Sequence, residues 1–298
     1  MSVVKTGAAG GRSRRPVERA RMRMRRQAPG VVLRYVVLLL LLVVAIGPFV
    51  WQVSTSLKGI GEDLYSLPPQ ILPSDPTTDA YRRVGEVVPV WRYAINSLIV
   101  AGSTVVFGTI GASMAGYALA RLRFRGSRVA LAVFLAGILI PGEVVLITRF
   151  LLSQSLGVTN TLLGVVLPTV VAPLNVLLMR NAFQAIPKEM DEAGMLDGAN
   201  VWRRFVHIAL PSAQGMVAVV AIFSFVSAWD DFLWPLMVLS DQDLYTLTVG
   251  LNFLQGTFST DPRVVAAGTI VAVLPLVIMF ILLQRYFFRG IGEGGLKG

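Results

Sequence analysis

Long apolar segments without any charged residue dominate the pattern of this chain. A helix that crosses the hydrocarbon layer of a membrane needs about 20 mainly apolar residues, and a charge inside it is costly. Five windows free of Asp, Glu, Lys and Arg reach that length: residues 35–57, 93–120, 150–179, 205–229 and 264–284. The pattern therefore predicts at least five membrane-spanning helices.

A sixth window, residues 129–151, is interrupted by Glu143, Arg149 and the pair Pro141-Gly142. The distribution of basic residues favours counting it, because Lys and Arg accumulate on the cytoplasmic side of membrane proteins. With six spans and a cytoplasmic N-terminus, 21 of the 27 Lys and Arg residues lie inside, whereas five spans leave only 16 there. The sequence thus predicts six spans with both termini in the cytoplasm.

Composition agrees with an all-α polytopic membrane protein. Hydrophobic residues make up 54% of the chain and charged residues 15%, whereas soluble domains carry about 25% charged residues. The net charge of +10 does not indicate nucleic-acid binding, since the basic residues are spread between apolar segments. The absence of cysteine excludes disulfides and thiolate metal sites, and we predict no metal and no cofactor.

The N-terminal residues 1–33 are predicted to form a basic cytoplasmic tail before a transmembrane domain at residues 34–298. The tail is rich in arginine, and we expect it to orient the first span and to contact anionic membrane lipid. A signal peptide would also begin with basic residues, but the following apolar run is too long for one and has no small-residue cleavage site.

Two segments are predicted to lie outside the membrane on the far side. Residues 58–92 contain four prolines (Pro68, Pro69, Pro73 and Pro76), which is typical of an extended, turn-rich loop. Residues 240–261 are more polar, and we expect residues 251–254 within them to lie on the membrane surface.

The cytoplasmic segment at about residues 182–212 has helix-boundary signals. Pro187 is suited to the first residue of a short helix, Gly198 to its end, and Asn200 to the N-cap of a second helix. The resulting helix–Gly–helix hairpin carries small, apolar and acidic residues at its tip. Such a tip is suited to docking a partner, or the hairpin is an amphipathic connector on the lipid headgroups; spacing alone leaves both open.

The tip resembles a known signature. Glu192-Ala193-Gly194, Met195-Leu196, Asp197-Gly198-Ala199 and then Ile208-Ala209-Leu210-Pro211 are similar to the EAA loop of binding-protein-dependent ABC importer permeases, with Gly194 in place of the usual Ala. Further stretches resemble the carbohydrate (maltose-type) branch of that family, over residues 33–298: Asn96-Ser97-Leu98, Ala118-Leu119-Ala120-Arg121, Pro141-Gly142-Glu143-Val144 and Trp229-Asp230-Asp231-Phe232-Leu233-Trp234-Pro235, with Gly294-Gly295-Leu296-Lys297-Gly298 at the end.

The resemblance implies a permease with six transmembrane helices in a bacterial-type cell membrane. Its expected partners are a second homologous permease, two cytoplasmic ATP-binding subunits, and an extracytoplasmic solute-binding protein or lipoprotein that delivers a sugar-type solute. The hairpin would be the coupling helix that contacts one ATPase, through Glu192, Ala193, Gly194, Met195, Leu196, Asp197 and Gly198. On this interpretation Glu192 makes an ionic contact, and Asp197 and Gly198 fix the turn.

The chain itself is not expected to hydrolyse ATP, because none of its lysines lies in a phosphate-binding P-loop motif. The single histidine, His207, is expected to line the hairpin. Candidates for the translocation path are Asn96, Glu143, Asp230 and Asp231. Each has a structural alternative: an interhelical hydrogen bond for Asn96, a local pair with Arg149 for Glu143, and a membrane boundary for Asp230 and Asp231.

Other functions predict other patterns. Import of a polyol or of a glycerol-linked phosphate would use the same architecture, although a phosphate would favour cations along the path. An ion-coupled secondary transporter would be expected to have inverted repeats and several intramembrane acids, and Glu143 stands nearly alone. A structural membrane scaffold would leave the hairpin tip unexplained.

Overall fold

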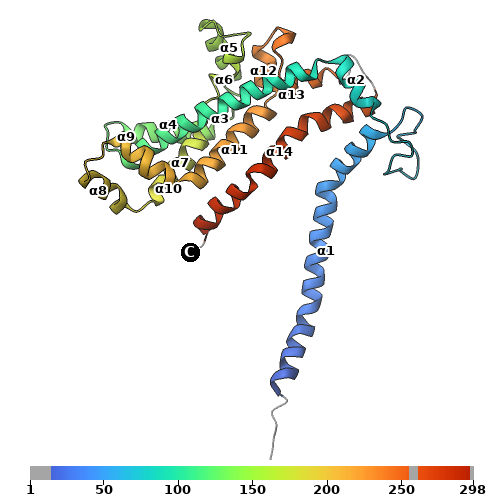
Figure 1. Cartoon of the computed structure of the whole chain (residues 1–298), viewed down its shortest axis with the longest axis horizontal. Coiled ribbons are helices and arrows are strands. Elements are labelled where there is room, and N and C mark those ends of the chain that lie inside the picture. Colours follow the sequence, from blue (N-terminus) through green and yellow to red (C-terminus); the bar gives the residue numbers. More distant parts are fainter. Residues whose placement is uncertain (1–14, 255–260, 296–298) are drawn as a thin grey trace, which may run out of the picture. The chain divides into compact units, whose positions relative to one another are not determined.

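The computed structural model describes residues 15–254 and 261–295, and within these ranges the regular elements are helices. The chain divides into two units, Met1–Ser54 and Thr55–Gly298, which are described separately (Figure 1). The first unit consists of most of helix α1 (Arg15–Leu57), whose part Leu33–Leu57 is long and apolar enough to cross a membrane. The helix predicted at residues 35–57 is confirmed, while part of the predicted basic tail lies outside the described residues.

The second unit begins with the end of α1 and continues through irregular structure and helices of very different length. In chain order the elements are α2 (Asp79–Val87), α3 (Val90–Arg121), α4 (Ser127–Leu139), α5 (Leu146–Ser155), α6 (Leu162–Val166), α7 (Pro173–Ala185), α8 (Lys188–Leu196), α9 (Val201–Arg204), the π-helical turn η1 (Phe205–Ala209), α10 (Leu210–Ser212), α11 (Gln214–Asp230), α12 (Leu233–Val238), the 3-10 turn η2 (Gln242–Leu244), α13 (Leu247–Asn252) and α14 (Pro262–Gly295).

Three described helical stretches are long and apolar enough to cross a membrane: Leu33–Leu57, Val90–Arg121 and Pro262–Leu282. A fourth is available if Val201–Ser212 and Gln214–Asp230, which meet at a bend of 83°, are counted as one span. The count of six spans therefore stays a prediction.

The windows predicted as the third and fourth spans are not continuous helices. Residues 129–151 are divided between α4 and α5 at Pro141-Gly142, and residues 150–179 between α5, α6 and α7. Proline lacks the N–H that the helix interior requires. Consistent with this, Pro168 lies in the gap between α6 and α7, and Pro173 opens α7 at its first position. Prolines also lie inside two of the long helices, Pro48 in α1 and Pro275 in α14.

Helix α3 forms the centre of the second unit, where it packs against α7 and α11 (Figure 1). Glycines on α3 permit this close approach. A Cβ at Gly108 would lie 2.4 Å from the carbonyl oxygen of Val170, in the stretch before α7, and a Cβ at Gly116 would lie 2.7 Å from the Cβ of Met179 on α7. Small residues let neighbouring helix backbones meet in this way in membrane proteins.

Both predicted outer loops contain more structure than expected. The segment 58–92 includes helix α2, with Ala80 and Val84 buried in an apolar cluster, and α3 already begins at Val90. In the segment 240–261, Leu251 and Leu254 are buried in the same cluster. The expectation that residues 251–254 lie on the membrane surface is therefore wrong, since these leucines pack against protein.

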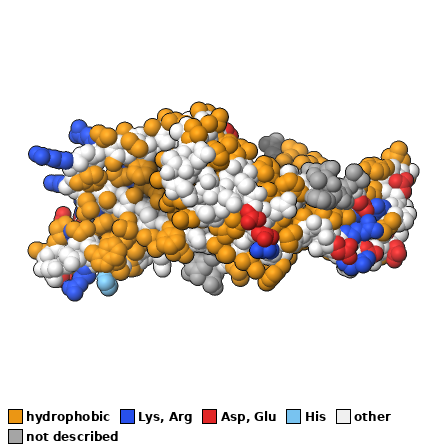
Figure 2. Space-filling view, turned by 90° about the horizontal axis from the view of Figure 1, so that it is seen from above, with side chains coloured by type: hydrophobic (Ala, Val, Ile, Leu, Met, Phe, Trp, Pro, Cys, Tyr) orange, Lys and Arg blue, Asp and Glu red, His pale blue; other side chains and the backbone are white. Residues whose placement is uncertain are grey.

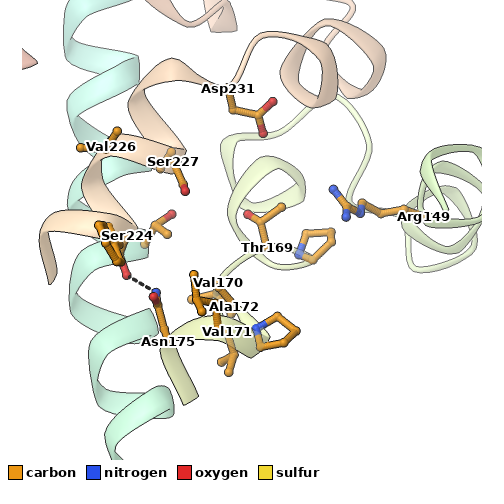
Figure 3. A pocket seen from close by; sticks show the side chains of 16 residues that line it. Arg149, Thr169, Val170, Val171, Ala172, Asn175, Ser224, Val226, Ser227 and Asp231 are labelled. Carbon is orange, nitrogen blue, oxygen red and sulfur yellow. Dashed lines mark hydrogen bonds between the residues drawn. The ribbon is translucent and has the colours of Figure 1, made fainter. Parts of the chain in front are cut away.

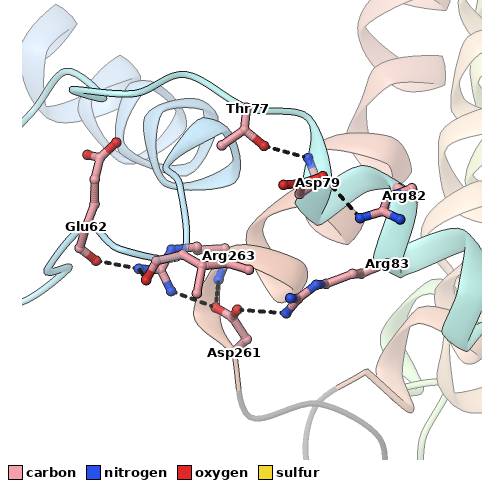
Figure 4. Close-up of polar contacts among 8 residues, drawn as sticks. Glu62, Thr77, Asp79, Arg82, Arg83, Asp261 and Arg263 are labelled. Atoms are coloured by element: carbon pink, nitrogen blue, oxygen red, sulfur yellow. Dashed lines mark hydrogen bonds and ion pairs between the residues drawn. The ribbon is translucent and has the colours of Figure 1, made fainter.

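Polar contacts join the first outer segment to the start of α14 (Figure 4). Arg263 donates to the backbone carbonyls of Ile60 and Glu62 and pairs with Asp261, which also pairs with Arg83 of α2 at 3.7 Å. Oε1 of Glu62 accepts backbone N–H groups of Asp75 (2.9 Å), Ser74 (3.1 Å) and Gly59 (3.4 Å). These contacts give the proline-rich segment a defined shape.

Candidate functional site

The hairpin predicted at about residues 182–212 is present as a helix–turn–helix. Pro187 is the N-cap of α8, one position before the expected first residue, and Gly198 follows the C-cap with φ +75°. A left-handed backbone is the usual helix ending that glycine permits. Oδ1 of Asn200 accepts the backbone N–H of Arg203 at 2.8 Å, so Asn200 is the N-cap of α9 as expected.

The inner face of the hairpin is held by a partly buried ion pair and a glycine contact. Arg204 and Asp191 pair at 3.0 Å, with side-chain exposures of 8% and 16%. Gly194 is buried against the second arm, where an added Cβ would lie 2.7 Å from Cδ1 of Ile208. Gly194 therefore faces the hairpin's own second arm and does not belong to the exposed tip.

The outer face of the hairpin is exposed and partly apolar. Of the residues predicted to couple to an ATPase, Glu192, Ala193, Met195, Leu196, Asp197 and Gly198 are exposed. Leu196 retains 90% of its accessible surface, and the nearby Trp202 on α9 retains 60%. In Figure 2 the pale blue side chain of His207, the chain's single histidine, lies near Lys and Arg side chains at the left of the view. This tip offers apolar side chains beside acidic ones.

The hairpin is anchored to the helices behind it. Rings of Tyr117 on α3, Phe183 on α7 and Phe205 on η1 pack together, with centroids 5.1 to 6.3 Å apart. Arg121 at the end of α3 donates to the backbone carbonyls of Phe183 and Ile186, just before α8. A force on the hairpin tip would therefore be transmitted to α3 and α7.

A second candidate site is a mostly apolar pocket of about 510 Å³ that contains several polar side chains and is lined by α3, α7, α11 and the non-helical stretch between α6 and α7 (Figure 3). Its polar lining residues are Thr104, Arg149, Thr169, Asn175, Ser224, Ser227 and Asp231. The amide of Asn175 donates to Ser224 Oγ at 3.0 Å, and both side chains are buried. Arg149 and Asp231 approach the space from different elements, α5 and the end of α11.

The structure brings only one of the four predicted path residues to this pocket, namely Asp231, whose Oδ1 accepts the backbone N–H of Trp234 at 3.3 Å. Asp230 is exposed and lines a different pocket beside α13 and α14. Asn96 is buried and donates to the carbonyl oxygens of Asp243 and Tyr245, which ties α3 to the outer segment around η2.

Glu143 is exposed, and the local pair expected between it and Arg149 is wrong, since no ion pair in the described part of the chain joins them. The guanidinium of Arg149 lies instead over the ring of Trp234, 5.2 Å from its centroid. Trp234 follows far along the sequence, so the sequence pattern favoured the nearer carboxylate.

Sequence reasoning missed Arg149, Asn175 and Ser224 as pocket residues. Arg149 carried a signal, because it is a charge within a window predicted to span the membrane. Asn175 and Ser224 are single polar residues in apolar segments, and only the packing of α7 against α11 brings them together.

Comparison with known proteins places the chain in a family. Over 208 residues it is 36% identical to the arabinooligosaccharides transport system permease protein AraQ of Halalkalibacterium halodurans, covering 70% of this chain and 75% of that protein. Over 270 residues it is 32% identical to the galactooligosaccharides transport system permease protein GanQ of Bacillus subtilis, covering 89% and 94%.

Among solved structures, a bacterial ABC transporter involved in the import of the acidic polysaccharide alginate has the same fold, with a TM-score of 0.77 at 23% identity over 88% of this chain and 98% of that one.

The model of the binding-protein-dependent transport system inner membrane components matches residues 108–293. These relatives are non-catalytic membrane subunits of ABC transporters. The chain therefore belongs to the family of binding-protein-dependent transport system inner membrane components, the permease subunits of ABC transporters.

Proposed function

We propose that this chain forms one half of the translocation path of an ATP-driven importer for a sugar or oligosaccharide. A second homologous permease completes the path, two cytoplasmic ATPases drive it, and an extracytoplasmic binding protein delivers the solute. Two observations support the solute class: the names of the relatives AraQ and GanQ, and a pocket whose hydroxyl and amide groups match the hydrogen-bonding groups of a sugar.

The main support for a coupling role is that the hairpin has a closed inner face and an exposed, partly apolar tip. Its inner face is closed by the Asp191–Arg204 pair and by Gly194, while Leu196 at the tip is 90% exposed. When a partner covers an exposed leucine, the burial of its apolar surface stabilises the complex. Glu192 beside it adds one charge-assisted contact, which contributes about 1.5–3 kcal/mol.

An ion-coupled secondary transporter is not favoured, because the chain belongs to the ABC permease family. Import of a polyol or of a glycerol-linked phosphate by the same architecture is not favoured either, since the relatives AraQ and GanQ are named for oligosaccharides.

The test uses the complete importer purified from membranes, with variants Glu192→Ala and Leu196→Ser. We expect Leu196→Ser to reduce co-purification of the ATPase, and Glu192→Ala to leave part of the assembly while lowering sugar uptake. Gln184→Ala, at an exposed residue in the last turn of α7 and away from the tip, is the matched control and should behave as the parent. Parental assembly and uptake in both hairpin variants, normalised to permease in the membrane, would refute the coupling role.

A further inference from the structure

The pocket of Figure 3 contains two opposite charges that are not paired with each other. Arg149 is part of no ion pair in the described residues, and Asp231 is in none either. Both line the same cavity of about 510 Å³. Arg149 lies within residues 129–151, which the sequence predicts as a span, and an unpaired charge in such a place is costly and marks a functional site by default.

The guanidinium of Arg149 contacts an aromatic ring that is itself anchored. Its central carbon lies over the buried ring of Trp234, 5.2 Å from the centroid, and the indole N–H of Trp234 donates to the carbonyl oxygen of Val165 at 3.1 Å. A guanidinium stacked on an aromatic ring keeps its N–H donors free at its edge. Because the ring limits its rotamers, Arg149 loses little conformational entropy when a ligand binds.

Asp231 supplies the complementary chemistry across the pocket. An ionised carboxylate accepts hydrogen bonds and cannot donate them, so it matches the hydroxyl groups of a saccharide. Its Oδ1 accepts one backbone N–H, from Trp234 at 3.3 Å, which leaves further acceptor positions. A guanidinium, in contrast, binds a carboxylate or another planar anion through two parallel hydrogen bonds.

We propose that this pocket binds an acidic saccharide, with its anionic group on Arg149 and its hydroxyl groups on Asp231. This inference rests on the proposed function, because it names the class of sugar for the same importer. An anion at Arg149 would form the direct ion pair that Arg149 does not form within the described part of the chain. A neutral sugar would form no ion pair there.

The test uses the absence of cysteine from the chain. Ser227 is exposed and lines the pocket, so Ser227→Cys in the full chain, in phosphatidylcholine vesicles, gives one thiol there. The rate of modification by the anionic reagent 2-sulfonatoethyl methanethiosulfonate is divided by the rate for the cationic 2-trimethylammonioethyl reagent. We expect this ratio to be higher in Ser227→Cys than in the double variant that also carries Arg149→Gln. The ratio of the two rates should fall about tenfold in Arg149→Gln and little in Arg149→Lys.

Ligand protection then decides the solute class. Digalacturonate should slow modification of the thiol, its neutral counterpart galactobiose should not, and Arg149→Gln should abolish the protection. Equal protection by both disaccharides, or protection by neither, would overturn the proposal. The proposal would also be overturned if phosphatidylglycerol in the vesicles protected the thiol as well as digalacturonate does, because the anion bound at Arg149 would then be a lipid headgroup.

Sugar uptake by the complete importer is measured separately and tests the proposed function alone. If digalacturonate does not protect the thiol while the importer still takes up neutral sugar, the acidic-saccharide inference is overturned and the importer function stands. Protection by digalacturonate in a protein that supports no saccharide uptake would overturn the importer function and support the pocket.

Discussion

A Cβ on Gly194 would lie 2.7 Å from Cδ1 of Ile208, so helix α8 rests directly on the second arm of its hairpin. The next nearest atoms are Cγ and Cδ of Arg204, at 3.3 and 3.4 Å. The family resemblance leads one to expect alanine at this position as part of the docking tip. The structure gives the residue an internal role, in which its small size sets how closely the two arms approach.

From this contact we predict that Gly194→Ala is tolerated and Gly194→Val is not. The methyl of alanine needs only the flexible end of Ile208 to move, whereas valine adds two more carbons to a filled space and should cost about 1–3 kcal/mol. Thermal unfolding of the purified permease measures the difference, with Ala193→Val on the exposed neighbour as control. A Gly194→Val variant as stable as the parent would show that the arms are not in contact.

The effect of substitutions at Gly198 should depend on the backbone conformation that this residue adopts and not on contacts of the added side chain. It has φ +75°, and a Cβ there would meet nothing within 4 Å. A β-branched residue is strained in the left-handed region, at about 1–2 kcal/mol, while asparagine visits it more readily. Gly198→Val should therefore reduce co-purification of the ATPase more than Gly198→Asn. Gly61→Val, which also meets open space but lacks the positive φ, is the control; equal losses in the two Gly198 variants would contradict this reasoning.

Asn96 should matter for stability. Its amide donates to the carbonyl oxygens of Asp243 at 2.9 Å and Tyr245 at 3.0 Å. Asn96→Leu removes both hydrogen bonds, and each such bond contributes about 0.5–1.5 kcal/mol. We expect a lower unfolding temperature, and little change for Asn252→Ala at an exposed site on α13. Unchanged stability with lost uptake would instead favour contact between Asn96 and the solute.

The stability of the outer segment at residues 58–92 should decrease in acid because Glu62 becomes protonated. Hydrogen bonds from backbone N–H groups, that of Asp75 first, lower the pKa of Glu62 below its ordinary value of 4.5. Because the folded form prefers the ionised carboxylate, its stabilisation is complete above pH 4.5 and is lost as the pH falls through the lower folded pKa. The unfolding temperature of Glu62→Gln should thus be below that of the parent at neutral pH and approach it in acid. Glu86→Gln removes an exposed carboxylate and its surface ion pair with Arg82 at 3.7 Å, and it should show a smaller difference. A gap for Glu62→Gln that persists in acid would contradict the assignment.

The predicted topology can be tested with single cysteines in a chain that has none. Thr77→Cys lies in the segment predicted to be outside, and Asn200→Cys in the hairpin predicted to be in the cytoplasm. An impermeant thiol reagent should label the first and not the second in intact cells, and both after permeabilisation. The reverse result at either site would refute the orientation with both termini in the cytoplasm.

Features that depend on near neighbours along the chain could be predicted from the sequence alone. Apolar windows predicted helices at residues 35–57, 93–120 and 264–284, because burial of backbone polar groups in a membrane requires helices. Gly198 and Asn200 predicted the ends of the hairpin helices, since a left-handed backbone and an N-cap are decided within a few residues. The motif around Glu192 was enough to indicate the family.

Features that depend on residues far apart in the sequence required the packed structure. Hydropathy does not distinguish one long helix from the sequence α5, α6 and α7, because a broken helix remains apolar throughout. The inward position of Gly194 depends on Ile208, and the place of Arg149 depends on the ring of Trp234. The sequence offered Glu143 as the nearer partner for Arg149, but packing placed an aromatic ring there and left the guanidinium facing a pocket.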